Sequence, residues 1–222
     1  MNVLALDGAL GGFSAAVACE NRVAAGVRET GNVALERGLV LVQSVLGEAG
    51  VPAERLDRLA VGIGPGGFTG LRIAIAYAKA LAAAWKLPLV PISSFDLLEY
   101  GGSFERVLTV VAGRPGVISA RYRYGDKIGR ASGRIAEVLD ELLPRSACPP
   151  QTGRAALDVV GASKDVRDAL AERGYPVRFV DPAVTPAAAA VALAAGSCAP
   201  AASLHEVRAD YGELPAAKAP KL

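Results

Sequence analysis

The chain has 222 residues, with 24 basic and 22 acidic side chains and a net charge of +2, and it carries one histidine, His205. One histidine cannot supply a two-histidine zinc motif or a 2-His-1-carboxylate iron site, and a Ser-His-Asp triad would have to include His205. Aromatic residues make up 5% of the chain, which argues against a base-stacking platform, and the small net charge does not make the whole surface a nucleic-acid footprint.

The length is sufficient for one or two domains with a real core. Cys19, Cys148 and Cys198 are widely spaced and form no CxxC motif, which favours free thiols in a reducing, cytoplasmic compartment. No basic segment precedes the first apolar run, and Asp7 interrupts that run, so no secretory signal is expected. The most apolar helix candidate, residues 71–85, carries two charges and is shorter than the roughly 20 residues of a membrane span, so no membrane span is expected.

Hydrophobic periodicity and turn residues predict strands and helices in two successive halves. In the first half, strands are expected at residues 1–7, 13–20, 23–30, 59–63 and 87–92, and helices at 33–49 and 71–85 and over a short stretch ending at 99. In the second half, strands are expected at 106–112, 117–124, 127–132, 157–161 and 177–180, and helices at 135–143, 165–173 and 186–195. The order of elements is therefore the same in both halves.

The two halves share this order but little residue identity, which indicates an architectural duplication rather than a sequence repeat. Hairpins followed by helical crossovers predict an α/β fold with a mixed sheet and flanking helices in each half. Two such lobes facing each other are the arrangement of the actin, Hsp70 and sugar-kinase superfamily, an actin-like ATPase (ASKHA, ribonuclease H-like) fold, and this analogy alone gives no function. The expected lobes are residues 1–102 and 103–222, with a C-terminal tail that can pack back on the first lobe.

A glycine-rich segment, residues 64–70, joins a buried strand to a helix. It is not a Walker loop, because no lysine follows its last glycine at the required spacing, and it is not a dinucleotide fingerprint, because no acidic partner follows at the required distance. Free N–H groups at the next helix could hold an anion, but a short glycine motif is more often a structural turn. A nucleotide-binding interpretation would use six residues in this region and at the end of the first strand: Asp7, Gly8, Gly64, Gly66, Gly67 and Thr69.

The surrounding sequence carries a more specific signature. Residues 61–73, Val-Gly-Ile-Gly-Pro-Gly-Gly-Phe-Thr-Gly-Leu-Arg-Ile, and the following Ala76, Lys79, Ala80 and Leu81 closely resemble the TsaB (YeaZ) family. The Gly-Pro-Gly-Gly-Phe-Thr-Gly block is the specific part. Shorter matches at residues 4–7, 42–43, 91–94 and 207–208 extend the resemblance over the whole chain.

The resemblance implies a two-lobed fold of the actin-like ATPase superfamily and a protein that is not itself the catalyst. It implies a scaffold that pairs with the related metal-dependent threonylcarbamoyl transferase TsaD, in a complex with the small ATPase TsaE. That complex modifies the adenosine next to the anticodon of tRNAs that decode ANN codons. A homodimer is expected in isolation, and contact with tRNA is expected to be indirect or auxiliary. An older label for such chains, M22 glycoprotease, would need metal ligands that this sequence does not have.

Three departures from the family pattern bear on nucleotide chemistry. The family usually has Asp-Thr where this chain has Asp7-Gly8, and commonly a histidine where this chain has Ala34. At the start of the second lobe, Ala112-Gly113-Arg114 replaces Asp-Ala-Arg. Superfamily enzymes use carboxylates at both strand ends to hold Mg²⁺ and position water, so with Asp7 alone no catalytic residue, metal or cofactor is expected. ATP or ADP binding by an ATPase or small-molecule kinase is the alternative, and a metalloprotease is a third interpretation.

The two long helices of the first half are apolar on more than one side. A helix that is apolar all round is buried all round, whereas a two-layer lobe covers only one side of it. The other side would lie either under the second lobe or against a protein partner, and the family resemblance places the partner contact on these helices. The expected interface residues are Leu35, Leu39, Val42, Leu46, Arg72, Ile75 and Lys79.

Residues 106–134 contain seven basic side chains and one acidic side chain. In the strand at 117–124, Arg121 and Arg123 are expected on one face, with Tyr122 and Tyr124 on the other. A solvated sheet edge is the favoured interpretation, and an auxiliary contact with the tRNA backbone is the alternative.

Two features are expected near the C-terminus. His205 is expected to be a surface or capping residue rather than a catalyst, because no serine elbow or cysteine context accompanies it. Residues 210–222 are polar and contain two prolines, so they are expected to be partly ordered at best.

Overall fold

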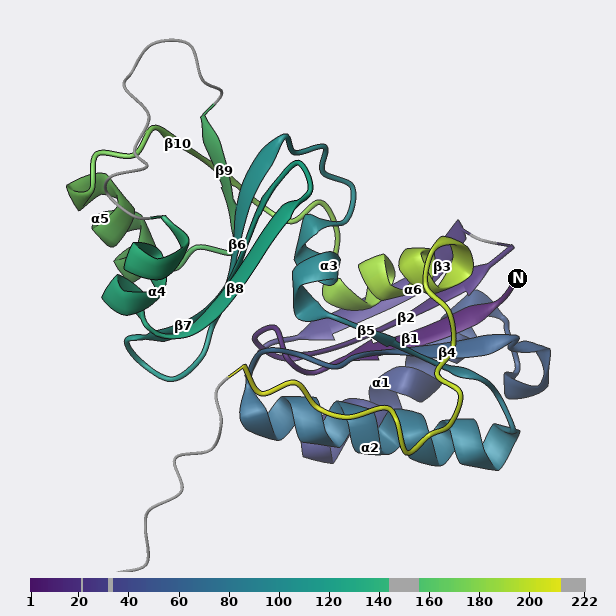
Figure 1. Cartoon of the computed structure of the whole chain (residues 1–222). Helices are drawn as coiled ribbons and strands as arrows, with labels where there is room; N and C mark the ends of the chain where they lie inside the picture. The colour runs from purple at the N-terminus through teal and green to yellow at the C-terminus, as the bar shows by residue number, and fades with distance from the viewer. Residues whose placement is uncertain (21, 32–33, 144–155, 213–222) are drawn as a thin grey trace, which may run out of the picture.

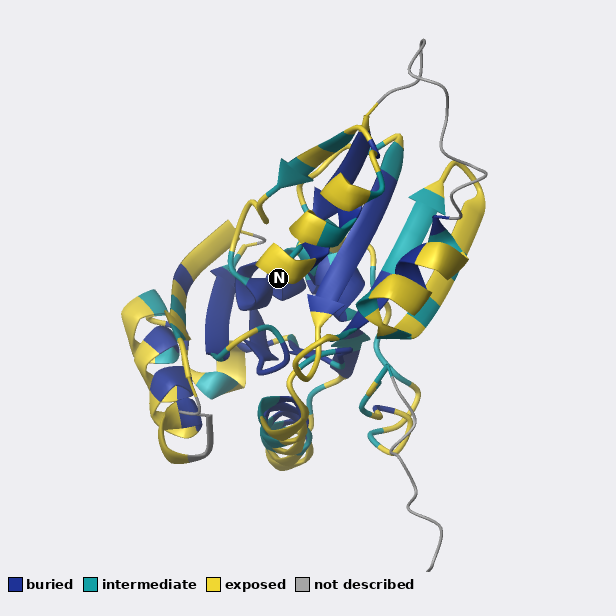
Figure 2. Cartoon of the chain, turned by 90° about the vertical axis from the view of Figure 1, so that its left-hand side faces the viewer, coloured by how far each residue is buried: buried dark blue, intermediate teal, exposed yellow. Residues whose placement is uncertain are grey.

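The structure, a computed structural model, describes residues 1–20, 22–31, 34–143 and 156–212, except for the side chains of residues 34 and 35. The described residues form two five-stranded mixed sheets, each flanked by helices (Figure 1). The duplicated α/β architecture predicted from the sequence is therefore present. Figure 2 shows the pattern of burial: the central strands are buried, and the outward sides of the helices are exposed.

The first sheet has the strand order β3-β2-β1-β4-β5. An antiparallel meander leads into two parallel crossovers, because β1 pairs antiparallel with β2 and parallel with β4. The strands are β1 (Val3–Asp7), β2 (Phe13–Cys19), β3 (Arg22–Glu29), β4 (Arg58–Gly62) and β5 (Leu89–Ile92). The helices are α1 (Ala34–Ala49), α2 (Phe68–Trp85) and α3 (Ser94–Glu99), and a short 3-10 turn, η1 (Ala53–Arg55), was not predicted.

The second sheet repeats this plan with the order β10-β9-β6-β7-β8. Its strands are β6 (Arg106–Ala112), β7 (Val117–Tyr124), β8 (Lys127–Arg134), β9 (Leu157–Val160) and β10 (Val177–Val180). The helices α4 (Ile135–Leu142) and α5 (Lys164–Glu172) cover one face, where Leu108, Val110 and Leu139 belong to one buried cluster. The opposite face of β6 and β7 is turned toward α3 and the first lobe (Figure 1).

The helix α6 (Pro186–Gly196) follows the second sheet in the chain but packs on the first sheet (Figure 1). Its alanines share a buried cluster with Val3, Ala5 and Ala60, and Arg58 Nη1 donates to the Ala194 carbonyl at 3.1 Å. The helices α1 and α2 cover the other face of the same sheet. The division of the lobes between residues 102 and 103 remains a proposal. The first sheet is covered by helices from both the first and the second half of the chain.

In the described ranges, every helix is too short or too polar to traverse a bilayer. Cys19 and Cys198 are free thiols, and Cys148 lies outside the described residues.

Candidate functional site

The carboxylate of Asp7, at the end of β1, is used to hold the turn that follows. Its Oδ2 accepts hydrogen bonds from the backbone N–H groups of Ala9 and Leu10, both at 3.2 Å. Its Oδ1 has no hydrogen-bond partner among the described residues and lies where a Cβ on Gly62 would collide with it. Burial raises the pKa of Asp7 to about 6, although the two N–H groups and the charge of Arg28 act in the opposite direction.

The glycines that follow β1 and β4 pack directly against each other's turns. A Cβ on Gly8 would collide with the carbonyl of Gly70, and a Cβ on Gly70 would collide with the carbonyl of Gly8. A Cβ on Gly66 would collide with the carbonyl of Ala9, which also accepts a hydrogen bond from Gly67 N at 2.8 Å. These glycines therefore permit close backbone approach inside the lobe.

Gly64, in the same turn, makes another close backbone contact, in this case with Asp210. Its φ of +97° is in the region that favours glycine, and a Cβ there would collide with the carbonyl of Asp210. Its own carbonyl accepts a hydrogen bond from Ser94 N at 2.7 Å. Thr69 is exposed in the first turn of α2. The contacts of these glycines favour the structural-turn interpretation of residues 64–70.

A cleft of about 1070 Å³ separates this turn from the second lobe. It is lined by the start of α2, the facing ends of β6 and β7, and the C-terminal residues Tyr211 and Gly212. An adjoining cavity of about 560 Å³ shares Gly67 and residues 111–113 with it. Neither lining includes an aspartate or glutamate among the described residues, and Ala112 occupies the end of β6.

These residues do not fit a magnesium–nucleotide complex. Mg²⁺ in such sites is held by carboxylates together with the phosphates of the substrate. The cleft linings supply no carboxylate from the described residues, and Asp7 is turned into the β1–β2 turn and against Gly62. Over the same part of the chain, no group of three or more His, Cys, Asp or Glu side chains is placed to hold a metal ion.

The residues of α1 that were expected at an interface differ in their burial. Leu41, Val42 and Val45 are buried against the first sheet, whereas Leu39 and Val40 are 45% and 55% exposed. Val42 is therefore a core residue and cannot contact a partner on the outer surface. Leu46 is half-buried, and the side chain of Leu35 lies outside the described residues.

The helix α2 is covered on three sides within the chain. The sheet and α1 cover two of them, and residues 201–209 pack against the same core cluster on the third. Ile75 is buried in this core, Lys79 is half-buried and Arg72 is exposed. The sequence offered the second lobe or a partner as the cover for α2, but part of that cover is the C-terminal segment.

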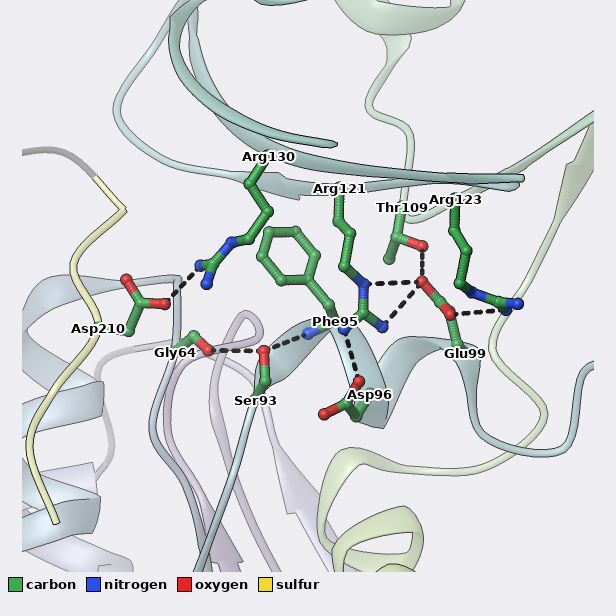
Figure 3. Close-up of polar contacts among 10 residues, drawn as sticks. All are labelled: Gly64, Ser93, Phe95, Asp96, Glu99, Thr109, Arg121, Arg123, Arg130 and Asp210. Carbon is green, nitrogen blue, oxygen red and sulfur yellow. Dashed lines mark hydrogen bonds and ion pairs between the residues drawn. The ribbon is translucent and has the colours of Figure 1, made fainter. Parts of the chain in front are cut away.

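Two arginines of the second sheet, Arg121 and Arg123, form ion pairs with the first lobe (Figure 3). Arg121 lies 2.7 Å from Asp96 and 3.0 Å from Glu99, and Arg123 lies 3.1 Å from Glu99. The hydroxyl of Thr109 also donates to Glu99. The expectation of a solvated edge was wrong for Arg121 and Arg123, since both join the sheet to α3.

The expected alternation in β7 is confirmed. Tyr122 packs against the core on the α4 side, opposite the face that carries Arg121. Tyr124 is exposed near the β7–β8 turn.

Near the C-terminus, His205 is exposed, and its carbonyl accepts a hydrogen bond from Arg208. Asp210, Tyr211 and Gly212 are placed by contacts with both lobes, whereas residues 213–222 lie outside the described part of the chain.

Comparison with known proteins identifies the family. The model of the family described as "TsaD: tRNA N6-adenosine threonylcarbamoyltransferase" matches residues 34–185, which is more than half of the chain. The protein called tRNA threonylcarbamoyladenosine biosynthesis protein TsaB, from Escherichia coli (strain K12), is 32% identical over 122 residues, or 53% of each chain. The chain belongs to the TsaB/YeaZ branch of the TsaD family. It spans about half the length of the curated relatives it matches.

Solved structures of TsaB/YeaZ relatives cover more of the chain. YeaZ from Pseudomonas aeruginosa is 25% identical and covers 95% of this chain and 99% of its own, with a TM-score of 0.66. The ethanolamine utilization protein EutJ from Carboxydothermus hydrogenoformans, at 15% identity and a TM-score of 0.50, is similar in fold alone. The predicted family and the predicted actin-like ATPase fold are both confirmed.

Sequence reasoning missed three exposed side chains near the proposed interface: Val40, Phe68 and Tyr211. Phe68 lies one helical turn before Arg72 on α2, so helical spacing could have found it. Val40 lies on a helix that is apolar on more than one side, which indicated that a second side of α1 would need cover. Tyr211 had no such signal, because it lies in a segment without periodicity.

Proposed function

We propose that this chain is a non-catalytic scaffold subunit of the machinery that makes threonylcarbamoyladenosine next to the anticodon of tRNA. In this role it binds and stabilises the TsaD transferase through α1 and α2. One observation carries the proposal: Asp7 and the glycines that would serve a nucleotide are engaged in contacts inside the fold, while α1 leaves the large apolar side chains of Leu39 and Val40 exposed. The name printed for the E. coli relative points to the same process.

The proposed surface rests on Leu39, Val40, Leu46, Arg72 and Lys79. Leu39 and Val40 are consecutive residues of α1 with largely exposed side chains, and exposed apolar area is what a protein partner would cover. A second copy of the chain would use the same face in isolation. TsaE would associate with the assembled complex, and we assign no binding site for it on this chain.

Contact with tRNA is proposed to be no more than auxiliary. Arg121 and Arg123 are engaged with carboxylates of α3 and are not available to a phosphate backbone without breaking those ion pairs. This supports a role for the chain that is exercised through protein contacts.

Reconstitution of tRNA modification with and without this protein is the primary test. The double variant Leu39→Asp, Val40→Asp should abolish co-purification with TsaD and lower modification, while circular dichroism shows a retained fold. The control is Ile128→Asp on β8, because Ile128 is 65% exposed but lies on the second lobe. Co-purification of the double variant at wild-type yield would exclude this surface.

A second candidate, a nucleotide-dependent enzyme, is favoured only by the size of the interlobe cleft. We expect no ATP turnover above the blank in the presence of Mg²⁺. Asp7→Asn, which keeps an oxygen for the turn N–H groups, should leave this result unchanged. Robust turnover that needs both Mg²⁺ and Asp7 would overturn the scaffold proposal.

A further inference from the structure

Residues 201–212, which we call the strap, run beside α2 from its C-terminal end to its first turn (Figure 1). Ala201 N donates to the Leu89 carbonyl at 2.9 Å, and Asp210 N donates to the Ile63 carbonyl at 2.7 Å. Val207, between them, is fully buried in the core of the first lobe. Most of the strap therefore belongs structurally to the first lobe.

The last residues of the strap are also held by the second lobe (Figure 3). Arg130 Nη2, on β8, lies 2.5 Å from Asp210 Oδ2. Gly212 approaches Ser119 of β7 so closely that a Cβ would collide with its hydroxyl. The strap end is thus clamped between the second sheet and the β4–α2 turn.

The same residues cover the start of α2. The carbonyl of Asp210 packs on Gly64, and the ring of Tyr211 lies 5.1 Å from the ring of Phe68. The guanidinium carbon of Arg72 lies 4.8 Å from the Phe68 ring centroid. A displacement of Asp210 would therefore change the contacts of Tyr211 with Phe68 and the packing of the turn that begins α2.

Repulsion between two arginines explains why the carboxylate of Asp210 stabilises the position of Arg130. Arg130 and Arg121 are directly opposite each other in the β7–β8 pairing, and like charges in that position repel. Arg121 is neutralised by Asp96 and Glu99, and both guanidinium groups lie within about 5 Å of the Phe95 ring centroid, at 5.2 and 4.9 Å. Asp210 supplies the carboxylate for Arg130.

The Arg121–Glu99 and Arg130–Asp210 ion pairs differ in their exposure to water. The side chains of Arg121 and Glu99 are 16% and 9% exposed, whereas those of Arg130 and Asp210 are 49% and 30% exposed. Water screens an exposed ion pair far more than a buried one. The Arg130–Asp210 pair is therefore the weaker link between the lobes.

We propose that the Arg130–Asp210 pair is a latch that ties the second lobe to the start of α2 through the strap. The latch opens while the Arg121–Glu99 contact keeps the lobes together. Opening frees Tyr211 and Gly212, uncovers Phe68 and widens the cleft that they line. This proposal concerns the chain alone and does not depend on its partner.

Hydrogen–deuterium exchange of the full chain tests the latch. Arg130→Ala and the near-isosteric Asp210→Asn should each speed exchange about two- to fivefold in peptides covering residues 207–212 and 63–72, and leave β6, β7 and α3 at the wild-type rate. Lys127→Ala, which removes an exposed positive charge from the same strand, should change neither region.

Two results would overturn the proposal. Wild-type exchange at residues 207–212 in both variants would show that the ion pair does not hold the strap. Equal acceleration in β7 and α3 would show that the strap and the lobe contact open as one unit.

Discussion

Arg121 and Glu99 form an ion pair across the lobe boundary, with Arg121 Nη2 3.0 Å from Glu99 Oε1. Glu99 also accepts from Thr109 and lies 3.1 Å from Arg123, so one carboxylate on a short helix gathers three groups of the facing sheet. The angle between the lobes is therefore set by contacts inside the chain. Such a fixed arrangement is consistent with the proposed scaffold role, because a surface of fixed shape loses little conformational freedom when a partner binds.

Glu99→Gln is expected to lower the free energy of unfolding by about 2–4 kcal/mol, because it leaves two arginines without their shared carboxylate at a largely buried position. Chemical denaturation at neutral pH measures the change. Lys164→Ala is the matched control, since its ion pair with Asp168 is exposed and should contribute little that can be measured. Equal losses in the two variants would show that Glu99 does not organise the lobe contact.

Stability should depend on pH through Asp7. Burial raises its pKa to about 6 from 3.8, so between these values the native state keeps a proton that the unfolded chain releases. The free energy of unfolding should therefore fall as pH rises from about 4 to about 6, by about 3 kcal/mol at most, with no further loss from this group above that window.

Asp7→Asn should remove this slope, whereas Asp126→Asn, in the exposed β7–β8 turn, should keep it. Denaturant titrations at a series of pH values across and above that window provide the measurement. The prediction is wrong if the free energies of unfolding of wild type and Asp7→Asn differ by the same amount at every pH in this series.

Gly8→Ala should destabilise the protein by about 3 kcal/mol or more, because the added Cβ would collide with the backbone carbonyl of Gly70. Gly47→Ala is the control: it lies in α1, where an added methyl group would meet no atom within 4 Å, and it should raise stability by up to about 1 kcal/mol through helix propensity. Thermal melts of both variants would show shifts of opposite sign. A neutral Gly8→Ala would mean that the two turns are not in backbone contact.

Strands with strong local signals were predicted most accurately from the sequence. The strands at 106–112, 117–124 and 177–180 have the predicted limits, since turn residues bound each of them. The helix α2 begins at Phe68, three residues before the predicted start, because the glycine-rich segment ends inside its first turn.

The buried side of α1 could not be predicted from periodicity, because the helix has apolar residues on two faces and either could be the core. Gly38 marks the buried side of α1. A Cβ at this position would collide with the Tyr77 ring, so the side of α1 that carries Gly38 must approach α2 and β2 closely. A C-terminal tail packing back on the first lobe was expected from the sequence, but the path of the strap, its ion pair with Arg130 and the Glu99 contacts were not predictable in this way. They join residues far apart in the chain, and none of them leaves a local pattern.

The position of α6 on the first sheet also has a consequence for synthesis. The alanine-rich face formed by β1, β2 and β4 is complete in sequence by residue 62, but the helix that covers it is residues 186–196. At roughly 5–20 residues per second, a ribosome needs several seconds to add the residues in between. During that time the apolar face of the first sheet lacks its cover, so we expect chaperones to protect the nascent chain until α6 has been synthesised.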